Sequence, residues 1–124
     1  MDKRTCIRID ANTKQLENCK SYLNHFDSAL SQLSNTLSLV GNEVRLKIIF
    51  LIQKEGPLCV CDLSDILGVS VSAISQHLRK LKDKNILKTQ RVAQLINYSI
   101  SAEYVPIISM ILSNVAIPKE ALSK

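Results

Sequence analysis

The sequence is poor in aromatic residues. Phenylalanine, tyrosine and tryptophan together make up 4% of its 124 residues, and there is no tryptophan. The hydrophobic share is nevertheless 46%, which is typical of a globular protein rather than a disordered one. A chain of this length fits one domain with a modest core, and that core must be built from leucine, isoleucine and valine.

The sequence also lacks long hydrophobic runs. No apolar segment approaches the ~18 residues that a membrane-spanning helix needs, and the N-terminal MDKRTCIRID has no apolar stretch of the kind found in secretory signals. We therefore expect a cytoplasmic protein without a membrane partner. Thiols stay reduced in that compartment, so the four cysteines indicate metal binding, thiol chemistry or packing before disulfides.

Positive charge is concentrated in one segment, RKLKDKNILKTQR, residues 79–91. The segment has a net charge of +5, which equals the net charge of the whole chain. Such a basic stripe is typical of nucleic-acid-binding proteins, because contacts to phosphates supply most of the affinity. A solvated surface helix would have the same composition, so charge alone does not decide between the two.

Helical periodicity predicts three helices in the first 56 residues of the chain. We expect Asn12 to cap the first and Asp27 to cap the second, each with an apolar stripe. The third begins at Asn42 and is apolar on most sides, which places it in the centre of the core. Gly56 and Pro57 are expected to end it.

The next two helical patterns resemble a helix-turn-helix over residues 62–84. The first is DLSDIL, led by Asp62 and closed by Gly68, and the second is VSAISQHLRKLKDKN, capped by Ser70. The turn between them, LGVS, is short and contains glycine, as in helix-turn-helix motifs.

Two strands and a last helix follow. Strands at residues 86–90 and 95–100 form a hairpin, the wing (86–100), whose turn lacks glycine and asparagine and should therefore be longer or looser than usual. An apolar helix is expected over residues 101–115, with Pro106 in its first turn. We expect it to form a dimer seam, or alternatively to pack within one subunit. The predicted fold is mainly α with a small β-hairpin, a winged helix-turn-helix in a single domain, residues 1–124, after an N-terminal arm, residues 1–15.

The second helix of the pair has two different faces. At about 100° per residue, an apolar inner face consists of Val71, Ile74, Leu78 and Leu81. The outer face carries a small hydroxyl, an amide and cations, which are side chains that bind base edges and phosphates: Ser72, Gln76, Arg79 and Lys80. Ser75 lies at the boundary of the two faces and could reach either a base or a phosphate. Lys88 and Arg91 on the wing are expected to add phosphate or minor-groove contacts, whereas His77 is expected to be packed and hydrogen-bonded rather than to bind a metal.

Two cysteines stand one residue apart in LCVC, residues 58–61. Residues two apart in a regular helix diverge by about 200°, but if Asp62 caps the helix, the Cys59 and Cys61 sulfurs could converge before it. A third thiolate from Cys6 would complete a trigonal site for As(III), Pb(II) or Hg(II), and Cys19 as a fourth would favour Cd(II) or Zn(II). Apolar packing is the alternative for each cysteine, above all for Cys19 on the apolar stripe of its helix.

The run LCVCDLSDILGVSVSAISQHLRKLKDKNIL, together with NEVRLKII and NYSI, resembles the ArsR/SmtB family of winged-helix metal-sensing repressors. The resemblance covers about residues 37–112, and Cys6 in the N-terminal arm makes the cadmium/lead-sensing branch the nearest. It implies a homodimer on double-stranded operator DNA, with Cys6 reaching the metal from the other subunit. The chain departs from that branch at Pro57, where a glutamate is usual, and lacks a second cysteine close to Cys6.

We therefore expect a metal-responsive transcriptional repressor and not an enzyme. Two recognition helices would enter successive major grooves ~34 Å apart, and metal binding would favour a conformation with poorer spacing. A redox switch that uses the same cysteines, or a constitutive DNA-binding protein with structural cysteines, is the alternative. A thiol oxidoreductase would require alternating strands and helices, which the sequence does not show.

Overall fold

The computed structural model describes residues 6–115. The chain divides into two units, residues 1–37 and 38–124, and each is described by itself. Within residues 6–115, none of the helices combines the length and apolarity that a membrane crossing requires.

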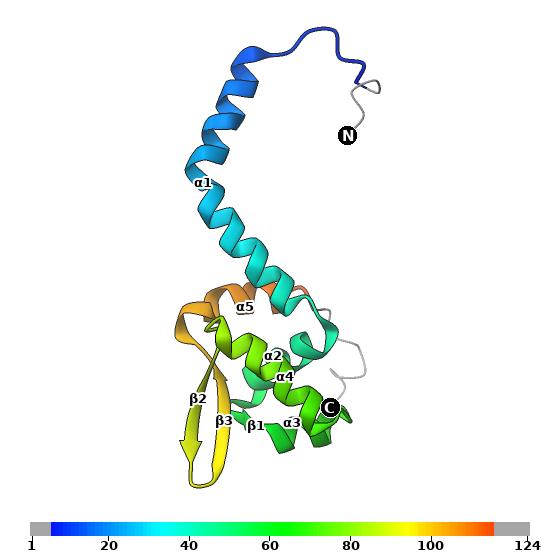
Figure 1. The fold of residues 1–124 in the computed structure, drawn as a ribbon, viewed down its shortest axis with the longest axis vertical. Coiled ribbons are helices and arrows are strands. Elements are labelled where there is room, and N and C mark those ends of the chain that lie inside the picture. Colours follow the sequence, from blue (N-terminus) through cyan, green and yellow to red (C-terminus); the bar gives the residue numbers. More distant parts are fainter. Residues whose placement is uncertain (1–5, 116–124) are drawn as a thin grey trace. The chain divides into compact units, whose positions relative to one another are not determined.

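The first unit is formed by a single long helix, α1, Thr13–Val40, whose last three residues belong to the second unit (Figure 1). The Asn12 side chain accepts a hydrogen bond from the Gln15 N–H at 3.0 Å, as expected of a cap. The prediction of a second helix capped by Asp27 is wrong, because α1 runs through this residue. Aspartate costs little inside a helix, and no glycine or proline lies in this stretch to end it.

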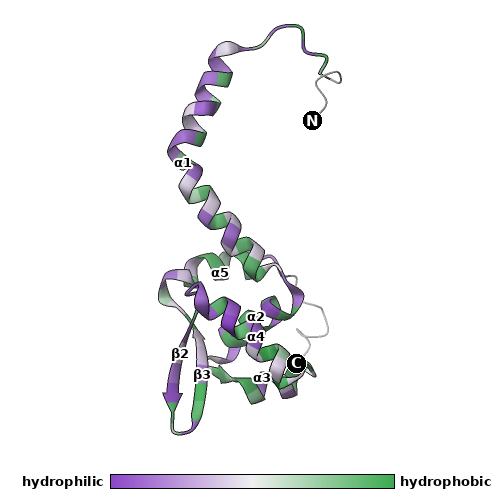
Figure 2. Cartoon of the chain, in the orientation of Figure 1, coloured by the Kyte–Doolittle hydropathy of each residue, from purple (hydrophilic) through white to green (hydrophobic). Residues whose placement is uncertain are grey.

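The apolar residues of α1 form an exposed stripe that we call the α1 seam. They alternate at spacings of three and four residues, and Figure 2 shows hydrophobic positions recurring along the helix. The large side chains of the seam are 38–58% exposed, and Cys19 is exposed among them. The seam consists of Leu16, Cys19, Leu23, Phe26, Leu30, Leu33 and Leu37.

The second unit packs four helices around an aliphatic core. After α2, Glu43–Glu55, come α3, Val60–Leu67, and α4, Val71–Asp83; the chain then forms a hairpin, a 3-10 turn at Ala102–Tyr104 and α5, Val105–Leu112. Every buried member of the core is aliphatic, as the shortage of aromatic residues predicts. The Asn42 side chain caps α2, and Gly56 ends this helix at φ 87°.

The wing is the larger part of a three-stranded antiparallel sheet in the order β1-β3-β2. Strand β2, Leu87–Val92, pairs with β3, Leu95–Ile100, along its whole length. Strand β1, Leu58–Cys59, pairs with the other edge of β3 and sets Cys59 opposite Asn97. The sequence did not predict β1, because two residues are too few to show an alternating pattern.

The turn of the wing is tight, so the prediction of a looser turn is wrong. Val92 pairs directly with Leu95, which leaves a loop of two residues. Ala93, the first of them, has φ 57°. A two-residue hairpin loop requires a positive φ at this position, and here alanine adopts it although glycine is usual.

Helix α5 packs within its own subunit on one side only. Ile108 and Leu112 are buried, whereas Met110 is 70% exposed. Pro106 lies in the first turn, as predicted. Among the described residues, apolar side chains of α5 therefore remain exposed, and Figure 2 colours much of this helix as hydrophobic.

Candidate nucleic-acid interface and thiol site

Helix α4 follows α3 after a short turn, in the geometry of a helix-turn-helix. Gly68 ends α3 at φ 66°, and the Ser64 hydroxyl donates to the Val69 carbonyl at 2.6 Å. The Ser70 hydroxyl then accepts a hydrogen bond from the Ala73 N–H at 3.2 Å. Ser70 is thus the cap that the sequence predicts, and it fixes where α4 begins.

The inner face of α4 is anchored in the core. Ile74, Leu78 and Leu81 are fully buried, as predicted. Val71, which the sequence places on the same face, is 50% exposed, so this prediction is wrong. Val71 is the first residue of the helix, and at a helix end the angular position alone does not determine burial.

The outer face of α4 is exposed along its length. This face combines two hydroxyls, an amide and two cations, and each of these residues is exposed: Ser72, Ser75, Gln76, Arg79 and Lys80. The arrangement can offer hydrogen bonds and positive charge to one surface.

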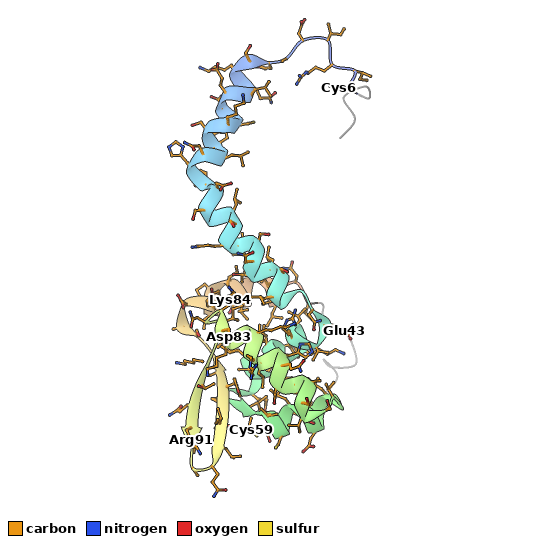
Figure 3. The ribbon with its side chains drawn as sticks, in the orientation of Figure 1. Cys6, Glu43, Cys59, Asp83, Lys84 and Arg91 are labelled. Atoms are coloured by element: carbon orange, nitrogen blue, oxygen red, sulfur yellow. The ribbon has the colours of Figure 1, made fainter. Side chains whose placement is uncertain are left out.

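The two wing cations are exposed but lie on opposite faces of the hairpin. Lys88 stands opposite Ser99, and Arg91, which Figure 3 labels on the hairpin, stands opposite Ile96. Residues three apart in a strand point to opposite sides. The two side chains therefore cannot both contact a surface that lies against one face of the wing.

His77 is half-buried beside the inner face of α4 and is hydrogen-bonded, as predicted. Its Nδ1 lies 3.1 Å from a terminal guanidinium nitrogen of Arg45 on α2. Burial, then the positive charges of Arg45 and Lys80, lower the pKa of His77 below its ordinary value. Each cause disfavours the imidazolium, so the contact between Arg45 and His77 favours the neutral ring.

Cys59 and Cys61 lie at the start of α3 in different environments. Cys59 is the residue before the helix and is 6% exposed, whereas Cys61 lies in the first turn and is exposed. The Cys59 N–H donates to the Asp62 carboxylate at 3.2 Å. The expectation that Asp62 is the cap is wrong: Asp62 is the third residue of α3 and bonds back to the true cap position.

The other two cysteines belong to the first unit. Cys6 precedes α1 and is exposed, as is Cys19 on the α1 seam. The alternative that Cys19 packs in an apolar core is therefore not found within its own unit. In the part of the chain that the structure describes, no three histidine, cysteine or acidic side chains form a group that could hold a metal ion.

Comparisons with known proteins agree with this geometry. Residues 42–89 match the family model described as bacterial regulatory protein, arsR family. A cadmium resistance transcriptional regulatory protein, CadC, of Listeria innocua is 33% identical over 96 residues, which are 77% of this chain and 76% of that protein. The arsenical resistance operon repressor of Escherichia coli is 35% identical over 63 residues, 51% of this chain and 54% of that protein.

Solved structures show the same fold. Reduced HlyU from Vibrio cholerae superposes with a TM-score of 0.70 at 28% identity and covers 77% of this chain and 100% of its own. The family match spans α2, the helix-turn-helix with the exposed polar face of α4, and the first three residues of β2. The chain belongs to the ArsR family of bacterial transcriptional regulators.

Proposed function

We propose that this protein is a transcriptional repressor that binds operator DNA as a homodimer and releases it when a thiophilic ion binds its cysteines. The observation that carries the DNA-binding part is the division of α4 into a fully buried inner face and an exposed polar and basic outer face. A helix held this way can enter a major groove without disturbing the core. Such a regulator acts in the cytoplasm, where the DNA is, and performs no catalysis.

Three sets of residues would contact DNA. Ser72, Ser75 and Gln76 would face the base edges, and Arg79 and Lys80 would bind the adjacent phosphates. On the wing, the opposite directions of Lys88 and Arg91 mean that one would reach the minor groove or its backbone while the other would remain in solvent.

The α1 seam supports the homodimer. Its alternating spacing of three and four residues is the repeat of a two-stranded coiled coil, and its large apolar side chains are about half exposed in the single chain. A second copy of α1 would cover this stripe, and a second copy of the chain would likewise cover the exposed side of α5 around Met110. Leu30→Asn should then shift the protein toward monomer in sedimentation equilibrium, while Ser31→Asn, next to it but off the seam, should not.

The start of α3 would supply half of a site for a soft ion. Cys59 precedes the helix and Cys61 lies in its first turn, and the two would provide two thiolate donors. A third or fourth must come from elsewhere, because no complete group exists among residues 6–115. Cys6 and Cys19 are exposed thiols without a packing role in their own unit. We infer that Cys6 supplies the third ligand from the second subunit, and that Cys19 is a fourth ligand only if pairing of the α1 seam leaves its thiol uncovered. Three thiolates suit As(III), Pb(II) or Hg(II), and four suit Cd(II) or Zn(II).

The position of Cys59 suggests how an ion would weaken DNA binding. This residue begins the first helix of the helix-turn-helix and also pairs with strand β3 of the wing. A ligand bond that pulled on Cys59 would therefore act on both DNA-binding elements. DNA must in turn weaken ion binding by the same factor, which typically corresponds to ~1–3 kcal/mol.

The test is a DNA-binding titration under reducing conditions, with a duplex that the protein selects from a randomised library. Cd(II), Pb(II), Hg(II), As(III) and Zn(II) are added in turn to the wild type and to Cys59→Ser. Serine is a favoured cap residue, so this variant should fold. We expect at least one ion to weaken wild-type binding while the variant does not respond. Equal affinity under every condition would contradict the metal hypothesis but not DNA binding.

A redox switch is the second candidate. Cys61 is exposed next to Cys59, and the similar structure of HlyU is described as that of a reduced protein. Peroxide should then release DNA in the absence of metal, and a thiol reductant should restore binding. Serine variants of the two cysteines, compared by mass spectrometry, would identify the pair that forms the disulfide.

A further inference from the structure

We infer that Arg45 and His77 are positioning residues that hold α4 in its DNA-binding orientation, through a hydrogen bond that exists only while His77 is neutral. This inference rests on the proposed DNA binding by α4. It concerns residues outside the thiol site and the outer face of α4.

The bond determines which ring nitrogen carries the proton. A guanidinium has only donors, so Nδ1 of His77, 3.1 Å away, must accept. The neutral ring therefore carries its proton on Nε2. When Nδ1 is protonated both ring nitrogens become donors, the bond is lost, and two cations remain in contact.

Arg45 is held firmly at its other side. Its Nε donates to the Leu39 carbonyl, one of the last carbonyls of α1 and therefore without a partner inside the helix. Its backbone N–H is bound by the Asn42 side chain at 3.1 Å. The Arg45 side chain thus joins the last turn of α1 to the middle of α4, and its backbone is fixed at the start of α2.

His77 is well placed to set the rotation of α4 about its axis. It lies between the outward Gln76 and the buried Leu78, at the boundary of the two faces. A small rotation around this point would change the direction of every outward side chain. The hydrogen bond adds a directional constraint that apolar packing does not provide.

Among residues 6–115, no carboxylate forms an ion pair or hydrogen bond with His77. The charged groups that act on His77 are Arg45 of α2 and Lys80 of its own helix, and both are cations. The carboxylates of α3, Asp62 and Asp65, and the cations of β2, Lys88 and Arg91, form no ion pair or hydrogen bond with it among the described residues. Protonation therefore breaks the contact without providing a new one.

The two effects of protonation on DNA binding have opposite signs. A positive charge added to α4 would by itself strengthen binding to phosphates. Loss of the positioning bond would weaken binding, by about three- to tenfold if it is an ordinary hydrogen bond. The inference requires that the second effect prevails, so operator affinity should fall as the pH is lowered from 7.5 to 5.5.

The experiment compares DNA affinity at these two pH values in four proteins, with the duplex selected by the wild type. His77→Asn keeps an acceptor at the position of Nδ1 but does not titrate, and His77→Leu removes the acceptor. His25→Asn is the matched control. The Nδ1 atom of His25 lies 2.8 Å from the Ser21 carbonyl and so must donate, the opposite arrangement to His77.

We expect the wild type and His25→Asn to lose affinity at low pH by about three- to tenfold more than His77→Asn does. His77→Leu should bind weakly at both values. The ¹⁵N shifts of the two histidine rings should show the proton on Nε2 in His77 and on Nδ1 in His25 at pH 7.5.

The inference would be overturned if the ratio of DNA affinities at pH 7.5 and pH 5.5 were equal in the wild type and His77→Asn. It would also be overturned if the neutral His77 ring carried its proton on Nδ1. Both outcomes are distinct from failure of the proposed function, in which the wild type binds no DNA at pH 7.5 at all.

Discussion

The backbone N–H of Cys59 donates to the carboxylate of Asp62 at 3.2 Å. The cap residue of the first helix of the helix-turn-helix is therefore a cysteine whose N–H is bound by an aspartate in the first turn. Cys59 is also paired with Asn97 in the wing. This hydrogen bond therefore joins the residue that bridges helix and sheet to the first turn of α3.

Asp62→Ala should lower the free energy of unfolding by about 1 kcal/mol, because it leaves the N–H at the start of α3 without its partner. Asp62→Asn should retain most of the stability, since its amide oxygen can accept the same bond. Asp65→Ala, an exposed aspartate in the same helix, is the control in urea unfolding. An equal loss in both alanine variants would mean that the bond does not contribute.

Ala93→Gly should raise the free energy of unfolding by about 0.5–1 kcal/mol. Ala93 has φ 57°, a conformation that glycine adopts without steric cost. Asn85, at φ 63°, provides the comparison: asparagine tolerates this region, so Asn85→Gly should change stability less. Thermal unfolding measures both, and a destabilised Ala93→Gly would show that the turn is not strained.

Leu78→Ala should destabilise the protein by about 2–5 kcal/mol, as is usual for a fully buried leucine. Val71→Ala should change the stability by less than about 0.5 kcal/mol, because half of this side chain is already in solvent. The two variants, compared by urea unfolding, test which residues of α4 the core covers. Similar losses in both would restore the sequence-based assignment of Val71 to the inner face.

Lys80→Ala should reduce the dependence of DNA affinity on salt concentration. If Lys80 contacts a phosphate, the slope of log K against log[salt] should fall by about 0.9 and binding should weaken on all duplexes alike. Lys20→Ala removes the same charge from α1 and should leave the slope unchanged. A slope that Lys80→Ala does not alter would place this side chain away from the DNA backbone.

The stability of the protein should fall in acid partly through His77. Its pKa is lowered in the folded state by burial and by two cations, so the unfolded chain binds the proton more tightly. The contribution of neutral His77 to the free energy of unfolding is complete above the ordinary histidine pKa of about 6.5. It is lost as the pH falls through the lower pKa of His77 in the folded protein. Urea unfolding between pH 7.5 and 5 should show a smaller loss for His77→Asn than for the wild type. Identical losses in the two proteins would mean that His77 binds its proton equally tightly in the folded and unfolded states.

The recognition helix could be predicted in detail because its signals are local. A serine cap, an apolar face at the helical repeat and a glycine in the preceding turn together determine where α4 lies and which face is outward. The exception is Val71, since at a helix end burial depends on what the neighbouring elements cover. The same local reasoning failed at Asp27, where a residue that can cap a helix lies inside one.

The thiol site was predictable only as a set of residues. The spacing of Cys59 and Cys61 identified them as a pair, but their unequal burial depends on strand β1, and a strand of two residues leaves no pattern. The Arg45–His77 bond joins residues 32 positions apart, and no local signal relates them.

The sequence by itself determined the class of the fold, the aliphatic core and the outward chemistry of α4, because short-range periodicity and capping govern helices and hairpins. Only the tertiary structure decided which cysteine is buried and that Arg45 links α1 to the recognition helix. These features arise from contacts between elements distant in the chain, and their geometry depends on the packing of the whole unit.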